Sequence, residues 1–327
     1  MNNDINILFS CDTNYAMPMT VCITSVFENN KDFKVNVFVF YSNLTEDQKE
    51  ILIKLAKQYN QNINQIKVDG HYFETAPTLR WSKETYYRLL FNELLPKDLK
   101  RIIYFDADTI VNKSIYDLFE LKLEDYSISA LPEIKSSEQR KRLGLSQNGN
   151  YYQAGVLVLD LDKCRKNLDY KKAEEVILSL GEKLLVVDQD IINVIFDGRI
   201  KKLDKKFNNC EITNFQKNNF NRFLNFTEKR LIDETVIFHF ATSKPWNNLF
   251  SGSCEEVWYK YLKLSPYSYL YNQKYSSLKY KILRTGLFKV FFYEYIHLTP
   301  TINKLALNLF PKKIYAKLKK YYRKNIK

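Results

Sequence analysis

Glycine is scarce in this sequence: only eight of the 327 residues are glycine. Neither G-x-G-x-x-G nor G-x-x-x-x-G-K-[ST] occurs, so the glycine-rich loops that cradle the phosphates of dinucleotides and nucleoside triphosphates are missing. Any phosphate-bearing ligand would therefore have to be held by a metal ion and by basic side chains.

Cysteine also provides no framework. There are five cysteines, an odd number, with no C-x-x-C pair, which argues against a disulfide or zinc scaffold and favours reduced, mostly buried thiols. No apolar run approaches the roughly 18 residues of a membrane-spanning helix. The first residues are polar and charged rather than those of a signal peptide. We therefore expect a cytoplasmic protein.

Acidic residues are almost absent from the last part of the chain. Residues 267–327 contain 14 Lys and Arg but a single acid, Glu294, whereas residues 1–266 contain 36 basic and 36 acidic residues. The whole formal net charge of +13 thus lies in this segment, which also contains ten Tyr and four Phe. Basic, aromatic, amphipathic segments lie in membrane interfaces and are attracted to anionic lipids.

We therefore predict two regions, a catalytic or binding domain over residues 1–266 and a basic, aromatic-rich helical extension over residues 267–327. The extension would associate peripherally with the anionic inner face of the cytoplasmic membrane. A helical subdomain with a solvated basic face is the alternative. Nucleic-acid binding also suits the charge, but nothing in residues 1–266 supports it.

Apolar strand patterns alternate with helical patterns through residues 1–266. Strand patterns cover residues 6–10, 34–41, 65–68, 102–105, 126–131, 155–161 and 235–240. Helical patterns cover residues 16–27, 45–56, 82–94, 136–145, 170–180 and 189–196, the second opened by the capping-box spacing of Thr45 and Gln48. The alternation predicts an α/β fold with a mostly parallel sheet flanked by helices, in which ligands bind beyond the carboxyl ends of the strands. Asp12, Asp106, Gln153 and His239 fall at or near such ends.

The segment 101–111 (RIIYFDADTIV) combines a buried strand with two carboxylates. The run of residues 102–105 suits a strand buried on both faces, and Asp106 and Asp108 follow it directly. Because bare carboxylates are costly to bury, we expect the pair to face a cleft. Residues two apart in an extended segment point the same way, so both could reach one divalent ion. A turn that merely contains two aspartates is the alternative.

His239 and Lys244 could complete a site with this pair. His239 ends a predicted strand, and a mixed Asp/Asp/His set suits Mn²⁺ better than a purely oxygen-lined magnesium site. Lys244 would lie near the same rim and could contact a diphosphate. A structural histidine and a solvated loop lysine are the alternatives.

Six motifs occur in an order that resembles glycosyltransferase family 8, the retaining α-galactosyl- and α-glucosyltransferases. They are FSCDTNY (9–15), ETYYRLL (84–90), YFDAD (104–108), YYQAGVLVLDL (151–161), DQD (188–190) and HFATSKPW (239–246). A later stretch, SCEEVWYKYLKLSPY (253–267), resembles the C-terminal extension of lipopolysaccharide core transferases of that family. The resemblance covers roughly residues 5 to 266.

The resemblance implies a GT-A type fold that uses UDP-galactose or UDP-glucose together with Mn²⁺, or alternatively Mg²⁺. The implied metal ligands are Asp106, Asp108 and His239. The implied nucleotide-binding residues are Ser10, Asp12, Asn14, Tyr15, Arg88, Asp106, Ala107 and Lys244. The implied donor- and acceptor-sugar residues are Arg88, Glu133, Gln153, Ala154, Asp188 and Gln189, with Asp188 and Gln189 as the catalytic pair.

The function implied is a retaining hexosyltransferase that moves galactose or glucose to a saccharide acceptor of a bacterial surface glycan, such as the lipopolysaccharide or lipooligosaccharide core. Gln189 is a poor nucleophile, so same-face substitution is favoured, in which a donor phosphate oxygen accepts the proton of the acceptor; a covalent glycosyl-enzyme is the other route. A sugar nucleotidyltransferase and a catalytically inactive, membrane-bound sugar-nucleotide-binding protein are the competing hypotheses.

Overall fold

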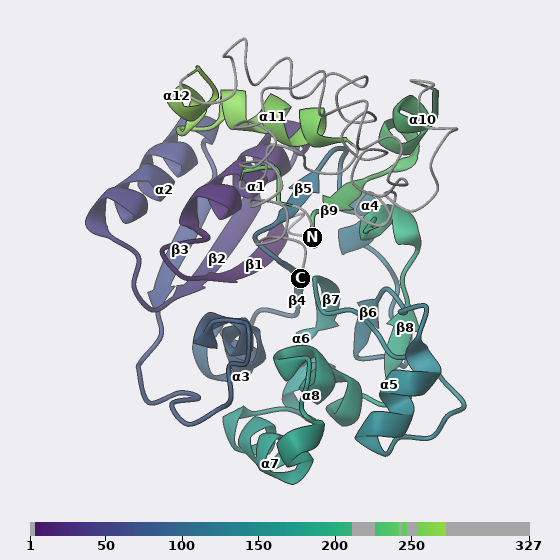
Figure 1. Ribbon diagram of the computed structural model, residues 1–327. Helices are drawn as coiled ribbons and strands as arrows, with labels where there is room; N and C mark the ends of the chain where they lie inside the picture. The colour runs from purple at the N-terminus through teal and green to yellow at the C-terminus, as the bar shows by residue number, and fades with distance from the viewer. Residues whose placement is uncertain (1–3, 211–225, 242–243, 247–253, 273–327) are drawn as a thin grey trace, which may run out of the picture. The chain divides into compact units, whose positions relative to one another are not determined.

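The computed structural model describes residues 4–210, 226–241, 244–246 and 254–272 (Figure 1). In this part of the chain, seven strands form one sheet in the order β3-β2-β1-β4-β7-β6-β8. Their bounds are β1 Ile5–Cys11, β2 Val35–Tyr41, β3 Asn62–Lys67, β4 Arg101–Phe105, β6 Ile128–Ala130, β7 Val156–Asp160 and β8 Ile200–Lys202. The predicted α/β fold with a mostly parallel, helix-flanked sheet is confirmed.

One strand of this sheet runs against the others. β7 pairs antiparallel with both β4 and β6, while the remaining neighbours pair in parallel. The expectation that Gln153 lies at a carboxyl strand end is therefore wrong, because this residue precedes β7. The reversal nevertheless brings the amino end of β7 beside the carboxyl end of β4, so Gln153 still lies at the same edge of the sheet as Asp106.

His239 does not belong to the main sheet, contrary to our expectation. It ends β9 (Ile237–His239), which pairs antiparallel with β5 (Thr109–Val111) in a separate two-stranded sheet. Thr109 is the direct partner of His239, and it follows Asp108 in the sequence. A short antiparallel pairing, and not a shared parallel sheet, thus brings the histidine to the aspartates.

Helices and 3₁₀ segments flank the sheet. They are α1 Ala16–Asn29, α2 Glu46–Tyr59, η1 Lys83–Leu90, α3 Phe91–Leu94, α4 Tyr116–Phe119, α5 Ser136–Leu143, α6 Leu161–Arg165, α7 Tyr170–Leu180, η2 Gly181–Lys183, α8 Val187–Ile195, η3 Lys205–Phe207, α10 Phe226–Glu234, α11 Glu255–Leu264 and α12 Ser268–Leu270. The capping box of Thr45 and Gln48 at the start of α2 is confirmed. The predicted helix 82–94 is instead a 3₁₀ segment followed by one α-turn, and Ser82 makes no capping bond.

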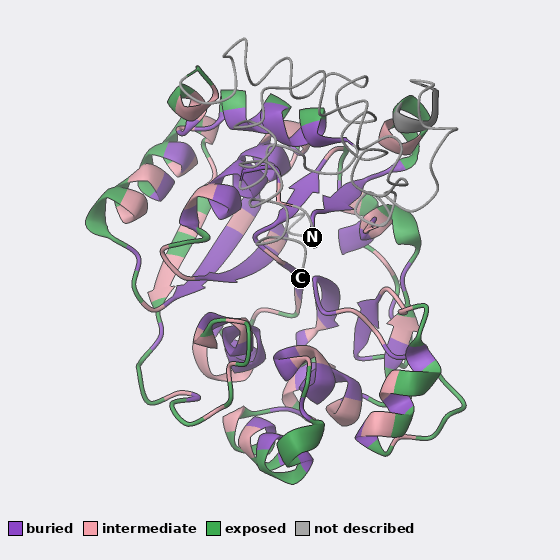
Figure 2. Ribbon diagram, in the orientation of Figure 1, coloured by how far each residue is buried: buried purple, intermediate pink, exposed green. Residues whose placement is uncertain are grey.

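Two hydrophobic clusters cover the two faces of the sheet. In β4, Ile102 and Tyr104 belong to the cluster that includes η1, α7 and α8, whereas Ile103 and Phe105 belong to the cluster that includes α1 and α2. The central strands β1, β2, β4, β6 and β7 are mostly buried, whereas the edge strand β3 and the outer faces of α2, α5 and α7 are partly exposed (Figure 2). The prediction that the apolar run before Asp106 is a strand buried on both faces is thus confirmed.

Among the described residues, none of the helices has the length and apolar composition of a membrane span. The predicted membrane-association region lies outside the described residues from residue 273 onward.

Candidate active site

One cavity of about 720 Å³ opens at this edge of the sheet. Every site residue predicted from the sequence lines it. These residues are Ser10, Asp12, Asn14, Tyr15, Arg88, Asp106, Ala107, Asp108, Glu133, Gln153, Ala154, Asp188, Gln189, His239 and Lys244. They come from segments scattered between residues 10 and 244, so the fold assembles the set rather than any local motif.

Asp106, Asp108 and His239 converge in what we call the metal-side cluster. One ligand atom from each lies within 4.8 Å of the other two, and His239 Nε2 is 3.2 Å from Asp108 Oδ1 and 3.7 Å from Asp106 Oδ2. The two aspartates lie in a turn between β4 and β5, where the Thr109 amide donates to the Asp106 carbonyl oxygen (3.1 Å). The expected extended geometry is therefore wrong, but the turn still points both carboxylates at His239.

The donor set of the metal-side cluster fits a divalent cation. Carboxylate oxygens and an imidazole nitrogen are ligands that Mn²⁺ accepts, and Mg²⁺ accepts the oxygens. Asp108 Oδ1 is buried and accepts no hydrogen bond from the described residues, although His239 Nε2 lies close. A buried carboxylate oxygen in this state is stabilised by a positive charge.

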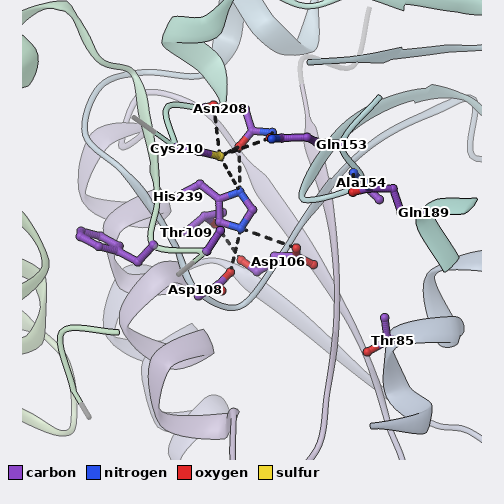
Figure 3. Close-up of polar contacts among 12 residues, drawn as sticks. Thr85, Asp106, Asp108, Thr109, Gln153, Ala154, Gln189, Asn208, Cys210 and His239 are labelled. Atoms are coloured by element: carbon purple, nitrogen blue, oxygen red, sulfur yellow. Dashed lines mark hydrogen bonds and ion pairs between the residues drawn. The ribbon is translucent and has the colours of Figure 1, made fainter. Parts of the chain in front are cut away.

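The orientation of His239 is set from behind by Asn208, which the sequence analysis missed. His239 Nδ1 lies 2.9 Å from Asn208 Oδ1, and Cys210 Sγ lies 3.4 Å from the same nitrogen (Figure 3). An amide oxygen only accepts, so Nδ1 carries the proton and Nε2 faces the aspartates. Gln153 Oε1 in turn accepts from Asn208 Nδ2 (3.3 Å) and from Cys210 (3.2 Å). Gln153 thus contacts the partners of His239.

Gly155 allows the close approach of these groups. A Cβ atom at this position would lie 2.2 Å from His239 Cε1 and 3.0 Å from Asp106 Oδ2. The Gly155 carbonyl oxygen also accepts the Asp106 amide at 2.8 Å, which ties the turn to the amino end of β7. Any larger residue would displace the histidine ring from the metal-side cluster.

Charges within the cavity shift the ionisation of this cluster. Burial disfavours the carboxylate of Asp108, but Lys244 and His239 together hold its pKa well below the usual range. Burial likewise opposes protonation of His239, yet Cys210 and Asp108 raise the pKa of the imidazole. A proton on His239 Nε2 and a divalent cation would compete for the same position, so metal binding should weaken as the pH falls.

Arg88 connects the metal-side cluster to the opposite wall. Its Nη2 lies 2.8 Å from Asp106 Oδ1, its Nε lies 2.9 Å from Asp188 Oδ2, and its Nη1 donates to the Ala154 carbonyl oxygen at 2.6 Å. The guanidinium stacks on Tyr104, whose hydroxyl donates to Asp106 (2.9 Å) and lies 3.1 Å from Ser10 Oγ. One guanidinium therefore serves two carboxylates. Burial raises the pKa of Asp188 to about 7 despite Arg88.

Glu133, Asp188 and Gln189 form what we call the α8-side cluster. The Gln189 side-chain oxygen accepts the Ala154 amide at 3.0 Å, and its Nε2 donates to Glu133 Oε1 at 3.0 Å. The amide is thus held at both ends. Burial raises the pKa of Glu133, which keeps this carboxyl closer to its neutral form.

Asp190 anchors the first turn of α8 and was not assigned a role from the sequence. It is fully buried and accepts from the Tyr151 hydroxyl (2.6 Å), from both terminal nitrogens of Arg142 (2.7 and 2.9 Å) and from the Leu185 and Val186 amides (2.9 and 2.8 Å). Because Arg142 lies in α5, the pair also connects α5 to α8. Asp190 therefore fixes the position of its neighbours Asp188 and Gln189.

The third group of predicted residues lies at the start of α1. Asp12 Oδ1 accepts the Asn14 and Tyr15 amides, each at 3.0 Å, and Oδ2 accepts from Asn14 Nδ2 at 2.8 Å. Tyr15 is 37% exposed and meets Trp246 edge-on, with ring centroids 6.2 Å apart.

Lys244 lies next to the metal-side cluster. It contacts Asp108 and donates to the Phe240 carbonyl oxygen (2.9 Å).

The fold, with a cavity at the edge of its sheet, is of the GT-A type. The same fold occurs in the crystal structure of the galactosyltransferase LgtC in complex with donor and acceptor sugar analogs, with a TM-score of 0.70, 23% identity and coverage of 80% of this chain and 96% of that chain. GlyE of Streptococcus pneumoniae gives a TM-score of 0.59 at 21% identity, covering 86% of this chain and 64% of that one.

The family model of Glycosyl transferase family 8 matches residues 6–249, and the chain belongs to this family. A lipopolysaccharide 1,2-glucosyltransferase of Escherichia coli is 26% identical over 275 residues, which is 80% of this chain and 79% of that protein. A lipopolysaccharide 1,3-galactosyltransferase of Salmonella typhimurium is 24% identical over 274 residues, 81% and 79% of the two chains. The predicted family and enzyme class are thus confirmed.

Proposed function

We propose that this glycosyltransferase is a Mn²⁺-dependent, retaining hexosyltransferase that moves galactose or glucose from a UDP-sugar to a saccharide of a bacterial surface glycan. The observation that carries the proposal is the convergence of Asp106, Asp108 and His239, next to Lys244, in the cavity at the carboxyl edge of the sheet. The glucosyl- and galactosyltransferase relatives, named for lipopolysaccharide, support the donor sugars and the class of acceptor.

The metal-side cluster would hold the divalent cation, with Asn208 orienting His239 from behind. A bound divalent cation would supply positive charge to the diphosphate leaving group, whose charge increases as the sugar–phosphate bond breaks. Lys244 would contact the same diphosphate. The ammonium is already held at Asp108, so little rearrangement would be needed to place it.

The uridine would bind at the start of α1. Tyr15 is exposed enough to stack on the base, and Trp246 supports its ring from the side. The contacts of Asp12 with the Asn14 and Tyr15 amides hold this turn in a fixed shape. Asn14, Ser10 and Ala107 would complete the nucleotide contacts.

The donor sugar would lie between Arg88 and the α8-side cluster. Asp188 and Arg88 would bind its hydroxyl groups, with Glu133, Gln153 and Ala154 nearby. Gln189 would lie beneath the anomeric carbon as a positioned neutral amide, because both ends of its side chain are hydrogen-bonded. A fixed amide is a weak nucleophile, which favours same-face substitution with the acceptor proton passing to a donor phosphate oxygen.

The deciding experiment is UDP release from UDP-galactose and UDP-glucose with Mn²⁺, with and without saccharide acceptors. We expect turnover with at least one donor and a loss of about a thousandfold in Asp108→Ala, because the cation then loses a charged ligand. Asp125→Asn, at an exposed position, is the control. Pyrophosphate in place of UDP would indicate a nucleotidyltransferase, and binding without turnover would indicate an inactive sugar-nucleotide-binding protein.

We also propose that the basic extension binds an anionic membrane surface. Its excess of 14 Lys and Arg over one acid supports this, as does the lipid-linked nature of the glycans for which the relatives are named. Tyr267 is buried and the Tyr271 ring lies 6.2 Å from that of Tyr259 in α11, so a truncation should end after residue 272. The full chain should float with anionic liposomes and the truncated chain should not; equal flotation would refute the proposal.

A further inference from the structure

Three cationic residues that line the cavity differ in how their charge is balanced. Arg88 is paired with Asp106 and Asp188, and Lys244 is paired with Asp108. Arg80 also lines the cavity, but within the described residues no carboxylate lies at ion-pair distance from it. Its charge is therefore available to a ligand.

Arg80 is held in place by the side chain that follows it. Its Cζ lies 4.3 Å from the centroid of the Trp81 ring, which is itself half-buried against the hydrophobic cluster on that face of the sheet. The Trp81 amide donates to the Thr78 carbonyl oxygen at 2.9 Å, which closes a turn in front of η1. A guanidinium stacked on an indole keeps its N–H groups free at the edge of its plane, where they can bind two oxygens at once.

Within the described residues, no ion pair joins Arg80 to the metal-side cluster. Arg80 and Trp81 precede η1, whose Thr85 lies apart from His239 in Figure 3, whereas Arg88 near the other end of η1 contacts Asp106. Glu133, Gln139 and Gln189 line the same cavity. The diphosphate of a donor already has Lys244 and the metal-side cluster, so an anion at Arg80 would belong to a different part of the bound substrates.

We propose that Arg80, stacked on Trp81, forms a subsite for an acidic group of the acceptor, a phosphate or a carboxylate carried by a sugar. This inference rests on the proposed function, since it names the class of acceptor that the same cavity takes. A planar guanidinium pairs with either group through two parallel hydrogen bonds, which a neutral saccharide cannot match.

The test is a titration of full-length protein, with Mg²⁺ and UDP in excess to fill the donor half, using glucose, glucose 6-phosphate and glucuronic acid as probes. We expect at least one acidic probe to bind about tenfold more tightly than glucose, by ligand-observed NMR, and this preference to disappear in Arg80→Gln. Arg80→Lys should keep part of it. Lys83→Gln removes a nearby charge that does not line the cavity and should keep all of it. Tighter binding of one acidic probe than the other would identify phosphate or carboxylate as the group bound.

Two results would overturn the inference. One is equal binding of the acidic and neutral probes by the wild-type protein, or an unchanged preference in Arg80→Gln. The other is a tenfold weaker binding of UDP in Arg80→Gln, which would assign Arg80 to the donor diphosphate. Failure of the proposed function is a separate result, in which wild-type protein neither binds UDP nor hydrolyses UDP-sugars.

Discussion

In the metal-side cluster, two carboxylates and an imidazole face one another across a few ångströms, whereas the centre of the α8-side cluster is the neutral amide of Gln189, which is hydrogen-bonded at both ends. Asp106, Asp108 and His239 meet with a carboxylate oxygen that accepts no hydrogen bond from the described residues. Gln189, by contrast, is satisfied at both ends by Ala154 and Glu133. The first arrangement is suited to binding a charge, and the second to holding a shape. Changes in the two clusters should therefore have different effects.

The largest effect that would distinguish the metal-side cluster from the α8-side cluster is a loss of activity in Gly155→Ala. The added methyl group would lie 2.2 Å from His239 Cε1, so the imidazole must move and the metal-side cluster must open. We expect UDP release to fall by at least about a hundredfold, about 2.7 kcal/mol of transition-state stabilisation. Gly70→Ala is the matched control, because a Cβ there meets nothing within 4 Å. Activity within twofold of wild type would show that the contact does not matter.

For the α8-side cluster, a large effect on stability is expected from Arg142→Leu. The variant leaves the fully buried Asp190 without its ion pair, so we expect the free energy of unfolding to fall by about 3 kcal/mol in urea titrations. The Mn²⁺ concentration for half-maximal activity should not change. Lys141→Leu, at the neighbouring exposed position of α5, should leave stability close to that of wild type. A shifted metal requirement would show that the two clusters are not separable in this way.

Asn208→Leu should act on metal binding alone. The buried amide orients His239 through Nδ1, and loss of such a partner lowers metal affinity by about 10- to 100-fold. The Mn²⁺ concentration for half-maximal activity should rise by that factor, while kcat at saturating Mn²⁺ stays within a few-fold of wild type. A lower kcat with an unchanged Mn²⁺ requirement would contradict the role given to Asn208.

The smallest effect, for a change of one pH unit, is on the free energy of unfolding. The pKa of Asp188 is raised by burial to about 7, so the folded state keeps a proton that the unfolded chain has already lost. Without divalent ions, the free energy of unfolding should fall as the pH rises from about 4 to about 7, by at most about 1.4 kcal/mol per unit. Asp188→Asn should flatten this slope in urea titrations across that range. An identical slope in the variant would show that Asp188 is already ionised.

Much of the fold could be predicted because local patterns determine it. The apolar run before Asp106 and the capping box of Thr45 and Gln48 both lie where the sequence places them. The direction of β7 could not be predicted, because a continuous apolar run indicates burial but not the orientation of the neighbouring strand. For the same reason, the pairing of β9 with β5 was missed.

The cavity-lining residues could be predicted through the ordered motifs, whereas their supports mostly could not. Asn208 lies in an irregular segment after η3 and carries no motif of its own. Gly155 offered a better clue, since it is one of only eight glycines and follows Gln153 and Ala154 directly. Arg142 and Asp190 contact only in the folded chain, because 48 positions separate them.

Arg88, shared between Asp106 and Asp188, gives the two halves of the cavity a common counter-ion. A cation bound at Asp106 would partly replace Arg88 as the counter-ion of that carboxylate, and Arg88 would then interact more strongly with Asp188. A hydroxyl group bound at Asp188 would in turn change the interaction of Arg88 with Asp106. Thermodynamic linkage then requires reciprocity: the factor by which cation raises sugar affinity equals the factor by which sugar raises cation affinity. Through this one side chain, the affinity of each half of the cavity for its ligand would depend on whether the other half is occupied.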